Sequence, residues 1–94
     1  MSEQATDQEL PHIDFATFVL SLSHSALVHL GEVPDPETDA TRVDLPLAKQ
    51  NIDILALMEE KTKGNLTGDE ERLLAQVLFD LRMRFVERSK TVSK

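Results

Sequence analysis

The fold is decided by residues 67–85, which read TGDEERLLAQVLFDLRMRF. Thr67 and Glu70 have the spacing of a capping box, in which each side chain accepts a hydrogen bond from the other residue's backbone N–H. The first turn after the cap is acidic, which favours a helix start because carboxylates are attracted to the positive end of the helix dipole. The stretch therefore predicts a long helix over residues 68–88, followed by a frayed tail at residues 89–94.

This predicted helix carries two apolar stripes on different sides. The main stripe repeats at helical spacing and consists of Leu74, Val77, Leu78, Leu81 and Phe85. The other, which we call the second stripe, consists of Ala75, Phe79, Met83 and Val86. One apolar stripe is enough to dock a helix onto its neighbours, so the second stripe predicts a further contact.

A second helix is expected just before this one, over residues 45–63. Asp44 can cap its start, and Gly64 follows as a stop. Only residues 64–67 then separate the two helices. Because short connections join antiparallel neighbours, the sequence predicts a helical hairpin.

A further helix is expected over residues 15–30, between Asp14 as N-cap and Gly31 as stop. Its apolar arc covers about half of the helix circumference, and it contains no Asp, Glu, Lys or Arg. Such a helix is expected to be buried on most sides. The predicted fold class is all-α: three main helices, with the second and third forming an antiparallel hairpin, the first packed on it, and oligomerisation completing the core.

The domain organisation is simple because 94 residues allow one domain. We expect a disordered acidic tail at residues 1–12, a helical domain at 13–88, and within it an acidic loop at 31–44 that contains two prolines. A monomer of this size buries only about 64% of the surface of its unfolded chain, so its core is marginal.

Composition excludes several classes of function. The formal net charge of −7 argues against a nucleic-acid partner, and the absence of cysteine excludes disulfides, thiolate metal sites and a cysteine nucleophile. A helix over residues 15–30 would reach about 24 Å, short of the roughly 30 Å hydrocarbon layer, so stable membrane insertion is not expected. The chain starts without the basic and apolar segments of a secretory signal, which predicts a cytoplasmic protein.

The surplus of apolar surface predicts self-association. Three helices of this size cannot bury all of these arcs in one core, and a second copy in a two-fold dimer is the simplest cover. The alternative is that the first helix covers the second stripe within one chain. The candidate contact residues are Phe15, Phe18, Leu22, Ala26, His29, Ala75, Phe79, Met83 and Val86.

No residue pattern indicates catalysis, a cofactor or a metal site. His24 and His29 are five residues apart and do not share a helix face, whereas a metal pair would be three or four apart. His29 lies within the apolar arc, which is typical of a hydrogen-bonded core or interface histidine. Two alternatives stay open: a small-ligand or catalytic pocket between subunits using His29, Arg82 and Arg84, and an adaptor role for the first helix on a membrane surface or another protein.

Several segments together resemble a known bacterial family. They lie at residues 15–22, 29–36, 44–50, 52–55, 59–67 and 81–85, and read FATFVLSL, HLGEVPDP, DLPLAKQ, IDIL, EEKTKGNLT and LRMRF. The chain resembles the family of domains of unknown function numbered 1844 over most of its length. This resemblance implies a bacterial, cytoplasmic, helical protein, and it supplies no catalytic residue, ligand or partner.

Overall fold

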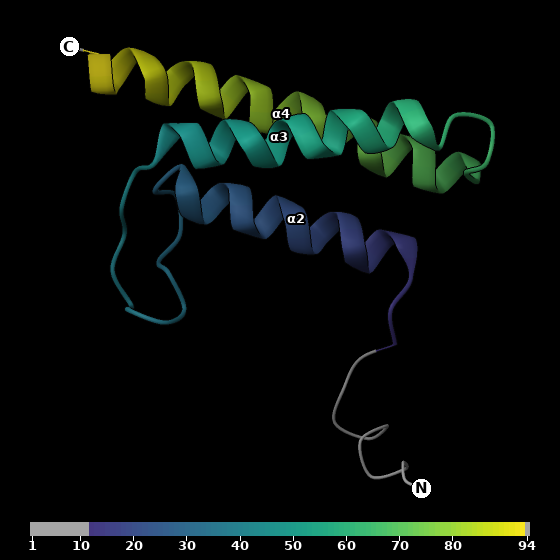
Figure 1. The fold of residues 1–94 in the computed structure, drawn as a ribbon, viewed down its shortest axis with the longest axis horizontal. Helices are drawn as coiled ribbons and strands as arrows, with labels where there is room; N and C mark the ends of the chain where they lie inside the picture. The colour runs from purple at the N-terminus through teal and green to yellow at the C-terminus, as the bar shows by residue number, and fades with distance from the viewer. Residues whose placement is uncertain (1–11, 94) are drawn as a thin grey trace, which may run out of the picture.

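Three helices make up the fold within residues 12–93, the part of the chain that the computed structural model describes. They are α2 (Phe15–His29), α3 (Leu45–Lys61) and α4 (Gly68–Ser93), shown in Figure 1. α3 and α4 run antiparallel as a hairpin, and α2 packs against both. The all-α class and the hairpin are therefore confirmed. The predicted tail at residues 1–12 lies outside the described residues, apart from His12.

The starts of α2 and α3 are capped by the expected aspartates. The Asp14 carboxylate accepts a hydrogen bond of 2.8 Å from the backbone N–H of Thr17. The Asp44 carboxylate accepts one of 3.2 Å from the N–H of Leu47. Each bond satisfies a backbone donor that has no partner within the first helical turn. Pro46 also lies in the first turn of α3, where a backbone N–H has no partner within the helix, so its missing N–H costs no hydrogen bond.

We expect the cap on α2 to weaken in acid. Hydrogen bonds from Thr17, first from its backbone N–H and then from its hydroxyl, lower the pKa of Asp14. A carboxylate whose folded-state pKa is depressed stabilises the protein above its unfolded pKa of about 4, and this contribution is lost as the pH falls through the folded-state value. Thermal unfolding should therefore show Asp14→Ala with a lower Tm than the wild type at neutral pH, and this difference should shrink in strong acid.

The loop carboxylate Glu37 provides the control for this experiment. It lies outside any helix, so Glu37→Ala should change the Tm little at either pH. A Tm difference between Asp14→Ala and the wild type that stays constant down to pH ~2 would contradict the assignment of the cap to the ionised carboxylate.

The start of α4 is the predicted capping box. The Thr67 backbone N–H donates to the Glu70 carboxylate at 2.9 Å, and the Glu70 N–H donates to the Thr67 hydroxyl at 3.1 Å. The far end differs from the expectation, because α4 continues to Ser93 and not to residue 88. No glycine or proline follows residue 88 to stop the helix, so the expected frayed tail at 89–94 is helical as far as Ser93.

The end of α2 is a Schellman motif built on Gly31. Its backbone N–H donates to the Val28 carbonyl at 3.0 Å, and the N–H of Glu32 donates to the Leu27 carbonyl at 2.9 Å. Gly31 has a φ of 77°, which glycine adopts without strain. The helix ends at His29, one residue earlier than expected, because Leu30 already serves as the C-cap.

The end of α3 is two residues earlier than predicted. The helix stops at Lys61, and the hydroxyl of the C-cap Thr62 donates to the Met58 carbonyl at 2.7 Å. Gly64 has a φ of 86°, so the chain has already left the helical conformation there. The glycine does follow the helix, but a short turn separates the two.

The core is small and entirely apolar among the described side chains. Each helix, with Leu30 just after α2, supplies three of its buried members: Val19, Ala26, Leu30, Ala48, Ile52, Leu55, Leu74, Leu78 and Leu81. The main stripe of α4 is thus confirmed as core, with Val77 and Phe85 packed at its edge. No polar or charged side chain is buried in this part of the chain.

The expectation that the first helix is buried on most sides is wrong for the single chain. Phe18 is 47% exposed and Leu20 is 52% exposed, on different sides of α2. α3 and α4 cover only one face of α2, so its uncharged arc is wider than its two neighbours can cover.

Candidate functional site

The second stripe of α4 lies open to solvent. Phe79 is 67% exposed, Met83 52% and Val86 51%, and Ala75 is exposed as well. Their spacing of four, four and three residues places them along one face of the helix. The alternative that α2 covers this stripe within one chain is therefore wrong. A face with phenylalanine, methionine and valine in water is typical of a surface that meets a partner.

A hollow lies beside this stripe, in the groove between α3 and α4. Its volume is about 360 Å³, and its lining comes from both helices: Lys49, Ile52, Asp53, Arg82, Phe85 and Val86. Ile52 is nearly buried and Phe85 is half-buried, so the floor is apolar. Lys49 and Asp53 form an exposed ion pair of 2.8 Å at the rim. Val86 belongs to both the stripe and the hollow, which makes them one continuous apolar surface.

The candidate contact residues on α2 do not form a matching surface. Ala26 is fully buried in the core, so it is not available to a partner. Phe15 and Leu22 are partly buried and pack against the core, and His29 is half-buried. Of the five residues expected to make contact from this helix, Phe18 alone is widely exposed.

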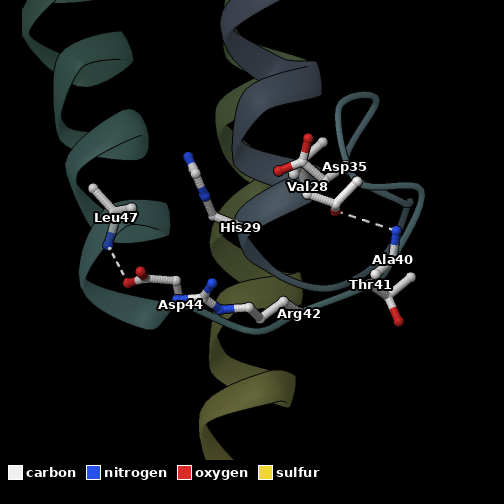
Figure 2. A pocket seen from close by; sticks show the side chains of 9 residues that line it. Val28, His29, Asp35, Ala40, Thr41, Arg42, Asp44 and Leu47 are labelled. Atoms are coloured by element: carbon white, nitrogen blue, oxygen red, sulfur yellow. Dashed lines mark hydrogen bonds between the residues drawn. The ribbon is translucent and has the colours of Figure 1, made fainter.

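His29 lines a separate cavity, of about 280 Å³, under the loop that joins α2 to α3. Figure 2 shows its ring projecting from the end of α2 toward α3, while Arg42 extends from the loop toward Asp44. The residues that line this cavity are Val28, His29, Asp35, Thr38, Ala40, Thr41, Arg42, Asp44 and Leu47.

The carboxylates of this cavity are used to build the loop itself. Asp44 caps α3 through its side chain, and its backbone N–H donates to the His29 carbonyl at 2.7 Å. The Asp35 carboxylate accepts a hydrogen bond of 2.8 Å from the Glu37 N–H. These contacts account for the two carboxylates in structural terms.

The alternative of a pocket between subunits names His29, Arg82 and Arg84, and within one chain these three side chains lie apart. His29 lines the loop cavity, whereas Arg82 lines the hollow between α3 and α4. Arg84 is held elsewhere by two carboxylates: Asp80 at 2.8 Å and Glu32 at 3.2 Å. Its hydrogen bond to Asp80 raises the pKa of Arg84. The three side chains therefore serve three different parts of the structure.

Glu32 links the end of α2 to α4. Its two carboxylate oxygens accept separately from Arg84 and Arg88, each at 3.2 Å. The Glu32 and Arg88 side chains are each 29% exposed, so this contact is more sheltered than the ion pairs along the helix surfaces. It explains these two arginines of α4 as structural groups.

Two kinds of site are absent from the described residues. No group of three or more His, Asp or Glu side chains within residues 12–91 could hold a metal ion. Likewise, none of α2, α3 and α4 has the length and apolar character needed to cross a bilayer.

The hollow is one feature that reasoning from the sequence missed. Its two walls come from helices whose relative register depends on how α3 and α4 pack. Helical spacing places Arg82 and Val86 one turn apart on α4, but only the packing brings both next to Lys49 and Asp53. The second stripe, in contrast, can be recognised from periodicity alone.

These features define an all-α protein with an apolar surface in the groove between two helices. The chain belongs to the family described as a domain of unknown function, DUF1844, whose model matches residues 12–87. The resemblance seen in the sequence is thereby confirmed. No curated protein and no solved structure matches the chain.

Proposed function

We propose that this protein is not an enzyme and that it acts by self-association through the second stripe of α4, in the bacterial cytoplasm that the family resemblance implies. The observation that carries this proposal is the exposure of Phe79, 67%, on a face continuous with an apolar hollow. An aromatic side chain offers about 150–250 Å² of surface, so this residue alone keeps on the order of 100 Å² in water.

The small core supports a partner of this kind. A chain of 94 residues gains limited stability from nine buried side chains, and burying the second stripe would add apolar burial at about 25 cal/mol per Å². Homodimers with two-fold symmetry are the commonest closed assemblies. A second copy is also present wherever the first is made.

A membrane surface is a weaker candidate for the partner. α2 contains no Lys or Arg, the residues that hold an interfacial helix on anionic lipid. Its exposed residues Phe18 and Leu20 lie on different sides of the helix and do not form one face.

The substitution Phe79→Asp tests the proposal. We expect the wild type to shift from monomer to dimer as its concentration rises into the tens to hundreds of micromolar, measured by size-exclusion chromatography with light scattering. Phe79→Asp should remain a monomer over the same range, because the aspartate no longer supplies the apolar side chain of the contact and its carboxylate must give up hydration to enter an apolar surface. Circular dichroism should show unchanged helix content, because the residue lies outside the core.

Leu20→Asp is the matched control. It introduces the same charge at an exposed leucine of α2, away from the second stripe, and should leave the dimer intact. A wild-type chain that stays monomeric at every concentration would refute self-association, and a Phe79→Asp variant that still dimerises would remove this stripe from the contact.

A further inference from the structure

We propose that the partner copy lies with its α4 antiparallel to the first, so that Phe79 of each copy fills the α3–α4 hollow of the other. This inference rests on the proposed self-association and specifies its geometry. It makes the hollow a binding site for an aromatic side chain of a second copy of this chain.

The first step is that the hollow suits a phenyl ring. Its floor is apolar, and its volume of about 360 Å³ leaves room for a large side chain. Arg82 stands at its edge, where a guanidinium can lie over an aromatic face in a cation–π contact. The charges at the rim include both signs, Lys49 and Arg82 against Asp53, so the rim does not repel a second copy through one excess charge.

The second step is that one helix carries both halves of the contact. Phe79 protrudes from α4, and the hollow's wall on the same helix begins at Arg82 and ends at Val86. The centre of that wall lies about 8 Å beyond Phe79 along the helix axis, since each residue advances the helix by about 1.5 Å. A surface that carries both a protruding group and its receptor is self-complementary, which favours a second copy over an unrelated partner.

The third step fixes the direction of the partner helix. In a two-fold contact, residue i of one copy meets residue j of the other, and j meets i in return. Parallel helices would place Phe79 opposite Phe79 and leave both hollows empty. Antiparallel helices that cross near Arg82 and Met83 bring each Phe79 to the other copy's hollow at the same time. The two α3–α4 hairpins then form a four-helix bundle, a stable arrangement for amphipathic helices.

The expected area makes this a weak dimer. A standard interface uses 20–30 residues and about 800 Å² on each partner. The stripe, the hollow and the polar positions beside them supply about a dozen residues per copy, which on the same scale is roughly 650–950 Å² in total. This size is at the lower end for specific contacts, which is why the association is expected to depend on concentration in the micromolar range.

Cysteine cross-linking tests the antiparallel arrangement directly, because the chain has no cysteine of its own. Ala75→Cys and Lys90→Cys place thiols at exposed positions near opposite ends of the second stripe, about 22 Å apart along α4. With a short bis-maleimide reagent, a mixture of the two variants should give a mixed covalent dimer. Neither variant alone should link to itself, and adding Phe79→Asp to both should abolish the product.

Each result has a distinct meaning. If Ala75→Cys and Lys90→Cys each link to themselves while the wild type is a dimer, self-association stands and the antiparallel arrangement is overturned. If the wild type is monomeric in light scattering at the concentration used for cross-linking, both proposals fail. Leu20→Cys on α2 is the control for random collisions, and it should form no product with either variant.

Discussion

Replacing Leu55 by alanine is expected to lower the free energy of unfolding by about 3 kcal/mol. The side chain is fully buried at the centre of α3, within a core of nine apolar residues. Its removal loses the transfer energy of the leucine and leaves a cavity that the three helices can close only in part. Since small domains are stable by about 5–15 kcal/mol, this change should remove a large fraction of the total.

Leu57→Ala provides a matched control on the same helix. The exchange of residue types and the change in helix propensity are identical, but Leu57 is 52% exposed. We expect its effect to be within about 0.5 kcal/mol. Denaturation by urea, followed by circular dichroism in the monomeric Phe79→Asp background, separates the two. Equal losses at both positions would show that α3 does not present the face described above to the core.

Gly31→Ala is expected to cost about 2–3 kcal/mol, in two parts. An L-residue in the left-handed conformation costs about 1–2 kcal/mol, and Gly31 has a φ of 77°. A Cβ at this position would also lie 2.8 Å from the Val43 Cγ2 atom, so that side chain must move. Val43 is held by a β-bridge to Leu30, which makes the move costly.

Gly64→Ala isolates the first of these parts. Gly64 has a φ of 86°, but nothing lies within 4 Å of the methyl group that alanine would add, so only the backbone cost of about 1 kcal/mol is expected. In a Val43→Ala background, the cost of Gly31→Ala should fall toward the Gly64→Ala value, because the clashing methyl is gone. Equal costs for the two glycines in the wild-type background, measured by denaturant unfolding, would contradict the steric part.

The helix starts could be predicted from the sequence because each rests on local chemistry. Asp14, Asp44 and the Thr67–Glu70 box all make the backbone hydrogen bonds expected of caps. The ends of α3 and α4 could be predicted less well. α3 ends at Lys61 because Thr62 caps it two residues before Gly64, and α4 continues to Ser93 because no glycine or proline follows residue 88.

The buried and exposed faces could likewise be predicted for one helix and not for another. On α4, charged residues separate the two apolar stripes, so the periodicity indicates that one stripe faces the core and the other does not. On α2, no charged residue marks the outer side, so the width of the apolar arc predicts burial although Phe18 and Leu20 are exposed. The hollow between α3 and α4 and the cavity at His29 depend on packing and loop geometry, which lie beyond local patterns.

The ion pairs of Glu32 with Arg84 and Arg88 and the proposed contact through the second stripe should respond oppositely to salt. Dissolved ions screen partly exposed charges, so the ion pairs between Glu32 and α4 should weaken as sodium chloride is added. Salts such as sulfate, which are excluded from protein surfaces, strengthen the burial of apolar groups and should favour pairing through the second stripe. The choice of salt can therefore distinguish the ion pairs within one chain from the proposed contact between two chains.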